Sequence, residues 1–378
     1  GIGKEDNIED TAQRFAGTLD GDSHTITLDI GATYGANVSG TEGNAAGQLY
    51  AKRSDQRDAH YSLALIPFAG NVTIQDLTIA GTVACRVPKN VKEEENSGDI
   101  RYPAFVSAAI GLASGNTTFE NVTVNTKVSV SEETDAKKLH VWQAGFLGRC
   151  ESEALTFQNC NWGSESTLID ERNTDNQRIG GLAAEVMGSC KVTVENCTLS
   201  GSITSKATSN ACVGGLIAVS RGETQNGSNN SYTSAVSTIN ILNLKVNGEA
   251  ITADASSTSG GLLGYQWKNT NVEFAASADN TDGASGVTIS GAALNAKAQF
   301  GGLVYQATGY WNATAANSII FKTENKTTTF TGKSTKNTPS GLLVGTGLIK
   351  VTQNGNEVVE SALYLEAGTW GVAFRCRL

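Results

Sequence analysis

The sequence predicts an all-β fold, a right-handed parallel β-helix (a β-solenoid) of about eight coils with terminal caps. Three observations support this prediction. A Gly followed by Leu or Phe recurs every 34 to 46 residues, apolar residues alternate with a period of two, and no comparable stretch shows the 3.6-residue period of a helix. The composition agrees, because 42 Gly, only 4 Pro and many Ser, Thr and Asn residues suit short strands joined by tight turns.

The repeat begins with the Gly-Leu or Gly-Phe dipeptide, and each copy is long enough for two or three short strands with their turns. Strands that recur without helical crossovers stack as the coils of a solenoid, with equivalent strands about 4.8 Å apart. Backbone groups then pair with the coils above and below. The copies start at Gly111, Gly145, Gly181, Gly215, Gly261, Gly302 and Gly341.

A second element carries an Asp or Asn beside an alternating apolar segment, in which Ile74, Leu77 and Ile79 share one face. Asn tolerates the left-handed conformation of a tight turn, and its amides stack well from coil to coil. We therefore favour a structural ladder over the alternative, a row of acceptors for a ligand or an ion. The column consists of Asp76, Asn121, Asn159, Asn196 and Asn243.

The repeats divide the chain into three parts. Residues 1–60 are expected to form an N-terminal entry cap and the first coil, and residues 61–349 the β-helix repeats. Residues 350–378 contain an Asn354-Gly355 hairpin signal and are expected to be a C-terminal cap or the start of another module. The chain starts at Gly1 without Met, so we expect it to belong to a larger multidomain protein.

The segment from Phe15 to Ile26 resembles the entry strand of GLUG-type β-helical proteins, and the later Gly-Gly-Leu runs followed by Asn-Cys or Asn-Val resemble their repeats. The resemblance covers roughly residues 13–345 and is partial, because several copies lack the second Gly of the motif. It implies a modular extracellular protein of bacteria, either secreted or displayed on the cell surface. It implies no single activity.

Charge and hydropathy narrow the range of partners. The formal net charge of −9 argues against nucleic acid or an anionic membrane as the main partner. The longest apolar run, from Ala104 to Ala113, is far shorter than the roughly 20 residues of a membrane-spanning helix. We therefore expect no direct membrane insertion.

No cofactor or metal is predicted. The seven cysteines form no C-x-x-C pair and the three histidines are far apart, so a zinc site is disfavoured. Calcium could bind the oxygens of Asp279 to Gly283, although a plain turn is favoured there. Cys160 and Cys197 share an inward column and either form a disulfide or remain buried thiols, and Trp162 is expected in the core.

Catalytic residues are not predicted either. Parallel β-helices that act as polysaccharide lyases or hydrolases need carboxylates or an Arg/Lys base clustered on one strand face. The Gly-Leu strands carry few such residues, and Glu185 and Arg149 are isolated in the sequence. A carbohydrate-active enzyme on the same fold therefore remains the alternative to a non-enzymatic module.

Long insertions suggest where a ligand would bind. The distance from the repeat Gly to the ladder position rises to 28 residues after Gly215 and 29 after Gly261, and insertions in a solenoid often build the binding face. Aromatic and polar side chains there either bind a ligand or cover the flank of the rod, two interpretations of equal weight. The candidates are Tyr265, Trp267, Tyr305, Tyr310, Trp311, Arg221, Asn229 and Asn230.

Taken together, these features favour a non-enzymatic extracellular surface module, an adhesin-like stalk or binding domain. Its expected partner is a glycan or a surface protein of a host or of bacteria.

Overall fold

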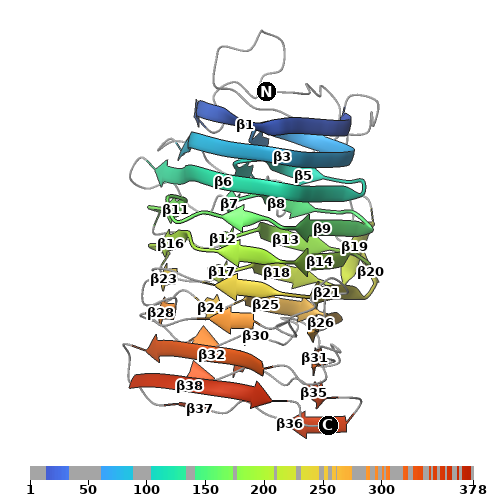
Figure 1. Ribbon diagram of the computed structural model, residues 1–378, viewed down its shortest axis with the longest axis vertical. Coiled ribbons are helices and arrows are strands. Elements are labelled where there is room, and N and C mark those ends of the chain that lie inside the picture. The colour runs from blue at the N-terminus through green and yellow to red at the C-terminus, as the bar shows by residue number, and fades with distance from the viewer. Residues whose placement is uncertain are drawn as a thin grey trace.

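The computed structural model shows an all-β protein in which parallel strands of successive repeats lie side by side (Figure 1). Rungs stack along the long axis from β1 (Phe15–Thr33), blue in Figure 1, to β38 (Gly368–Arg375), red. No helix occurs in the part of the chain that the structure describes, so the predicted all-β, parallel organisation is confirmed. That part comprises residues 14–33, 61–87, 104–132, 141–172, 177–207, 211–226, 231–246, 251–253, 258–260 and 262–274, and beyond them only strands that lie between residues 287 and 375.

One side of the coils is a nine-stranded sheet of very short strands, most of which lie just before a repeat Gly. Its strands pair in parallel, except for the final pair, which is antiparallel. The strands are β2 (Tyr61–Leu63), β4 (Ala104–Ser107), β7 (Val141–Ala144), β12 (Arg178–Gly180), β17 (Cys212–Gly214), β24 (Thr258–Gly260), β29 (Phe300–Gly301), β33 (Ser340–Gly341) and β37 (Tyr364–Leu365).

The other sides belong to one 27-stranded sheet that bends around the core and nearly closes. The column that overlaps or follows the repeat Gly starts at the beginning of β3 (Ile66–Val87) and continues through β5 (Ile110–Ala113), β8 (Leu147–Cys150), β13 (Ala183–Met187), β18 (Ile217–Arg221), β25 (Leu263–Lys268), β30 (Val304–Gln306) and β34 (Val344–Thr346). The next column holds β6 (Thr117–Glu132), β9 (Ala154–Gln158), β14 (Lys191–Glu195), β21 (Ser237–Ile241), β26 (Thr270–Phe274), β31 (Ser318–Phe321) and β35 (Lys350–Gln353).

The long strands β1, β3 and β6 run on into the last side of the coil, which later coils build from separate short strands. These are β10 (Asn161–Trp162), β11 (Thr167–Asp170), β15 (Cys197–Leu199), β16 (Ser202–Ser205), β22 (Leu244–Val246), β23 (Ile251–Ala253), β27 (Val287–Ile289), β28 (Leu294–Ala296) and β32 (Thr327–Ser334). A two-stranded hairpin, β19 (Glu223–Asn226) with β20 (Ser231–Ser234), leaves the coil after β18.

Antiparallel pairs gather at the C-terminal end of the stack. β38 pairs antiparallel with β32, along eight residue pairs from Thr327↔Arg375 to Ser334↔Gly368. The expected hairpin at Asn354-Gly355 lies between β35 and β36 (Asn356–Val359), which pair antiparallel. The change of strand direction distinguishes this end from the parallel rungs before it.

The core is built from the inward half of each alternating strand, and the predicted inward residues Ile74, Leu77 and Ile79 are all buried. In the next coils, register places Phe119 and then Phe157 over Ile74. Their rings stack with centroids 5.1 Å apart and an interplanar angle of 3°, while Phe146 meets both edge-on. Parallel in-register stacking thus converts one apolar residue per coil into a continuous apolar column.

The repeat Gly is required by the close approach of successive turns. A Cβ on Gly145 would lie 2.4 Å from the carbonyl oxygen of Gly181, and a Cβ on Gly181 would lie 2.1 Å from that of Gly215. The amide of Gly145 donates to that same Gly181 oxygen at 3.0 Å. Any side chain here would separate the coils at the turn, which explains why Gly marks the repeat.

The Asp and Asn column lies where the second and third sides of the coil meet, and its side chains bond in two runs, Asp76 to Asn159 and Asn196 to Asn243. The amide nitrogen Nδ2 of Asn121 donates to Oδ1 of Asp76 at 2.9 Å, and Nδ2 of Asn159 donates to Oδ1 of Asn121 at 3.1 Å. Asn243 donates in the same way to Asn196 at 3.0 Å. The first four members have φ between 49° and 55°, the left-handed region that Asn tolerates better than most residues. These residues therefore stabilise the turn, both by adopting its left-handed conformation and by bonding between coils.

We expect Asn196→Ala to lower the free energy of unfolding by about 1–3 kcal/mol, because Ala fits the left-handed turn poorly and removes the acceptor for Asn243. Urea unfolding monitored by circular dichroism measures the change. Asn240→Ala is the matched control, since Asn240 lies on β21 in the same sheet without a positive φ. A midpoint for Asn196→Ala that equals that of the control would remove Asn196 from the ladder.

The remaining predicted core residues are buried as expected. Trp162 is 3% exposed and belongs to the main core, beside Gly145 and Gly201. Cys160 and Cys197 are free thiols whose Sγ atoms donate to backbone carbonyl oxygens, so the structure contains the buried-thiol alternative. Among the described residues no helix is long and apolar enough to cross a membrane.

Candidate functional site

A second cluster of buried side chains lies apart from the main core, between the nine-stranded sheet and the column that follows the repeat Gly. Phe105 and Trp142 contribute from β4 and β7, and Phe68, Leu112 and Ala184 from the facing strands β3, β5 and β13. The rings of Phe105 and Trp142 are tilted, with centroids 5.2 Å apart. This cluster forms the apolar base on which a charged network rests.

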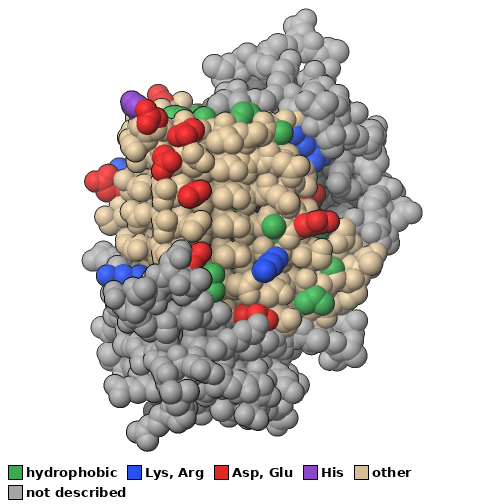
Figure 2. Space-filling model, turned by 45° about the vertical axis from the view of Figure 1, so that its right-hand side comes forward, with side chains coloured by type: hydrophobic (Ala, Val, Ile, Leu, Met, Phe, Trp, Pro, Cys, Tyr) green, Lys and Arg blue, Asp and Glu red, His purple; other side chains and the backbone are tan. Residues whose placement is uncertain are grey.

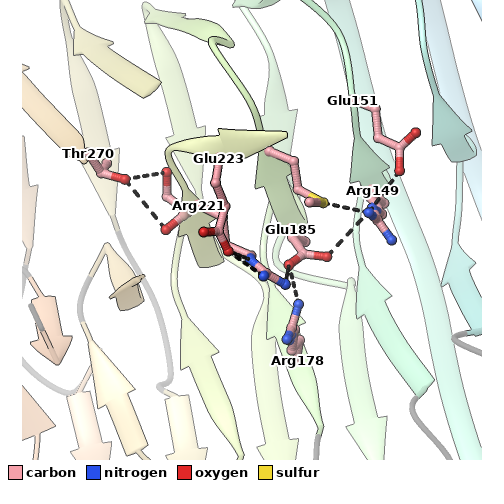
Figure 3. A network of polar contacts seen from close by, with 9 residues as sticks. Arg149, Glu151, Arg178, Glu185, Arg221, Glu223 and Thr270 are labelled. Carbon is pink, nitrogen blue, oxygen red and sulfur yellow. Dashed lines mark hydrogen bonds and ion pairs between the residues drawn. The ribbon is translucent and has the colours of Figure 1, made fainter. Parts of the chain in front are cut away.

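The charged network, here called the polar seam, consists of Arg149, Glu151, Arg178, Glu185, Arg221 and Glu223 (Figure 3). Glu185 on β13 is at its centre and is fully buried. Its Oε1 accepts a hydrogen bond from Arg178 and lies 3.7 Å from Nη1 of Arg221. Its Oε2 lies 3.6 Å from Nε of Arg149. One carboxylate thus contacts guanidinium groups from β8, β12 and β18.

The outer members complete the balance of charge. Nη2 of Arg149 lies 2.8 Å from Oε1 of Glu151, and Arg221 forms an ion pair with Glu223 at the start of the hairpin. Three guanidinium groups therefore face three carboxylates. Because burying an unpaired charge is costly, this mutual pairing is what allows the six side chains to lie in a largely dry seam.

The guanidinium groups of the polar seam also contact aromatic rings. The guanidinium carbon of Arg178 lies 4.1 Å from the ring centroid of Trp142, and that of Arg149 lies 5.6 Å from it. The guanidinium carbon of Arg221 lies 4.6 Å from the ring of Trp267. Such contacts are attractive, and they fix the direction in which each guanidinium points.

Burial lowers the pKa of the Arg178 guanidinium, and the neighbouring Glu185 opposes that change. Burial thus disfavours the charged guanidinium, and the negative charge of the carboxylate stabilises it. The arrangement ties together β8, β12, β13 and β18.

The expectation that Glu185 and Arg149 are isolated is wrong. They are direct neighbours in the parallel register of β8 and β13, and the 36 residues between them equal the spacing of the repeat Gly residues at 145 and 181. That shared offset was the signal in the sequence. Arg178 was missed because it precedes the Gly turn, which folds its strand back toward Glu185.

A second buried ion pair, also absent from the sequence interpretation, lies at the end of β11. Arg172 donates two hydrogen bonds to Asp170, from Nε to Oδ1 at 2.9 Å and from Nη2 to Oδ2 at 2.6 Å. Both side chains are buried to 99% or more. Gln177 donates to the Arg172 carbonyl oxygen and accepts from Ser205. Asp170 follows Leu168 on the inward face, and this charged residue at a core position was the overlooked signal.

This pair also affects a nearby thiol. Burial raises the pKa of Cys85 to about 12, an effect that the positive charge of Arg172 partly opposes. Cys85 is therefore protonated and behaves as an apolar core residue.

The predicted ligand-binding residues have different environments. Tyr265 is 4% exposed and packs against Ala218 and Val219, a position that fits the alternative in which these aromatic residues cover the flank of the rod. Arg221 belongs to the polar seam. Trp267 is only partly buried, and its ring centroid is 5.2 Å from that of Tyr265. For Tyr305 only the strand is described, and Asn229, Asn230, Tyr310 and Trp311 lie outside the described residues, as does the 279–283 segment.

The described residues hold no group of three or more His, Cys, Asp or Glu side chains arranged to bind a metal ion. Comparison with known proteins finds no family model that matches the chain, and no curated protein matches it.

Proposed function

We propose that this chain is a non-enzymatic extracellular surface module of bacteria, a stalk or binding domain built on a right-handed parallel β-helix. The observation that carries the proposal is the polar seam, whose six charges pair with one another. A seam whose carboxylates already contact guanidinium groups stabilises a rod and leaves little capacity for acid-base chemistry.

The finer fold assignment rests on connectivity. Strands of successive coils pair in parallel, and connections between parallel strands of one sheet are overwhelmingly right-handed. The resemblance of Phe15 to Ile26 and of the Gly-Gly-Leu runs to GLUG-type proteins supports the extracellular, bacterial setting.

The outer face of the rungs suits such a module. Figure 2 shows a broad face with few charged or hydrophobic side chains. Four threonines occupy equivalent outward-facing positions on successive coils, namely Thr73, Thr118, Thr156 and Thr193. A neutral polar face keeps a long sheet soluble without creating a field that attracts nucleic acid.

The proposed partner is a glycan, bound near the partly exposed ring of Trp267. Arg221 lies over this ring and Tyr265 beside it, and the proposal places a sugar against the part of the ring that is exposed. Tyr305, Tyr310, Trp311, Asn229 and Asn230 are proposed to extend the site. A protein ligand at the same place is an outcome that the test distinguishes.

We expect Trp267→Ala to weaken glycan binding by at least about tenfold, because it removes the only partly exposed ring that the described residues offer there. A glycan array identifies the ligand and calorimetry measures its Kd. Val236→Ala, at an exposed hydrophobic residue beside the hairpin, is the control and should leave binding unchanged. Equal affinity of both variants, or binding only to proteins, would reject the proposed glycan site.

The second candidate is a carbohydrate-active enzyme, favoured by the convergence of Glu151, Glu185 and Glu223 in one seam. Assays for reducing ends and for unsaturated products on a panel of polysaccharides test it. Turnover that is lost in Glu185→Gln while the variant remains folded would replace the binding proposal by this one.

A further inference from the structure

Two thiols from successive coils touch in the main core. Sγ of Cys150 and Sγ of Cys190 are 3.7 Å apart, and both side chains are fully buried. Cys150 ends β8, and Cys190 directly precedes β14 one coil later. A disulfide needs about 2.05 Å between the sulfur atoms. Side-chain rotation therefore has to close a gap of only about 1.6 Å.

The backbone around Cys190 is held from both neighbouring coils. The amide of Lys191 donates to the carbonyl oxygen of Glu153 at 2.8 Å, on the coil that carries Cys150. The carbonyl oxygen of Cys190 accepts from Thr238 at 3.0 Å, on the coil beyond. These bonds place the two cysteines next to each other whenever the rungs are in register.

We propose that Cys150 and Cys190 form a disulfide that cross-links two successive coils when the chain folds in oxidising surroundings. The proposal rests on the extracellular location proposed above, because disulfides persist outside the reducing cytosol. Since both thiols are buried in the finished coil, the bond forms while these rungs assemble.

The reaction is thiol–disulfide exchange with an external disulfide such as oxidised glutathione. The Cys150 thiolate attacks one glutathione sulfur and releases the other as a thiolate. The Cys190 thiol then loses its proton to the released thiolate, attacks the Cys150 sulfur and expels the second glutathione. Two cysteine thiols are oxidised and one external disulfide is reduced.

Cys160 and Cys197 are the matched comparison within the same chain. They are also buried and lie on successive coils. Their thiols also hydrogen-bond each other, and in addition their Sγ atoms donate to the backbone carbonyl oxygens of Phe119 and Phe157, at 3.4 and 3.5 Å. The redox state of this second pair is read in the same experiment as an internal comparison.

The test refolds the full chain from denaturant in a glutathione redox buffer, blocks the remaining thiols and maps the peptides without reduction. Trypsin separates peptide 150–172, which holds Cys150 and Cys160, from peptide 179–191 with Cys190 and peptide 192–206 with Cys197. Further cleavage after Glu151 or Glu153 separates Cys150 from Cys160. The expected product joins the Cys150 peptide to peptide 179–191.

Stability gives an independent readout that needs no ligand. Closing a loop of this length should raise Tm by about 3–6 °C in the oxidised form over the reduced form. The difference should vanish in Cys150→Ala and Cys190→Ala, and persist in Cys160→Ala with Cys197→Ala. If an alanine variant does not fold, peptide mapping of the unaltered chain still decides.

Seven labelled thiols after oxidative refolding, or a cross-link that joins only Cys160 and Cys197, would overturn the proposal. The result is independent of the binding function, because a chain that binds no glycan can still form the cross-link in the redox buffer.

Discussion

Asp170→Asn is expected to lower the free energy of unfolding by about 3–5 kcal/mol, because the buried guanidinium of Arg172 loses the carboxylate that accepts two of its hydrogen bonds. Arg172 is 1% exposed, and its guanidinium donates two hydrogen bonds to the carboxylate of Asp170. Asn has almost the same shape as Asp, so the loss reports charge and hydrogen bonding and not packing. Urea unfolding followed by circular dichroism and by tryptophan fluorescence gives the measurement.

Two comparisons identify the cause. Asp29→Asn removes an exposed carboxylate of β1 and should change stability by less than about 0.5 kcal/mol. Combining Asp170→Leu with Arg172→Met should recover much of the loss, because apolar side chains then replace both members of the buried ion pair. If Asp170→Asn unfolds with the midpoint of Asp29→Asn, the ion pair does not stabilise the coil.

Glu185→Gln is expected to cost about 2–4 kcal/mol, because three guanidinium groups would then face only two carboxylates in the polar seam. The effect should be smaller than at Asp170, since Arg178 and Arg221 have side chains that are 14% and 11% exposed, and water can solvate part of their charge. Chemical unfolding measures this change as well.

The controls use the charge balance of the seam. Glu153→Gln alters an exposed carboxylate of the same coil as Arg149 and should be nearly neutral. Adding Arg178→Gln to Glu185→Gln leaves two guanidinium groups with two carboxylates, so the double variant should be more stable than the sum of the single effects. Strict additivity would show that Glu185 and Arg178 do not interact across the turn.

The all-β parallel fold could be predicted because its signals are local and repeated. Alternation at Ile74, Leu77 and Ile79 defines an inward face, and the Gly column marks the turns that approach most closely. Each of these signals involves only a few neighbouring residues, and it recurs in every coil because the repeats stack on one another. The described parts of the chain contain both features where the sequence indicated them.

The polar seam could not be read from the same signals. Glu185 and Arg149 meet only after the register of β8 and β13 is known, and Arg178 reaches them from the other sheet. Burial of Tyr265 likewise depends on Ala218 and Val219 one coil earlier. Contacts between coils follow the exact number of residues per coil, which varies from 34 to 46 along the chain. Pattern alone therefore finds the faces of strands more readily than the partners of charged side chains.

The antiparallel strand β38 interrupts the series of parallel rungs beside β32. A stack of parallel rungs resembles a growing filament, since each exposed edge can template another strand of the same polarity. Pairing of β38 with β32 reverses that polarity, so a second molecule arriving with its β1 would meet a strand that runs the wrong way for continued parallel growth. An arriving strand with the direction of β1 would therefore have to pair antiparallel with β38, and the repeat of parallel rungs would be interrupted at this place.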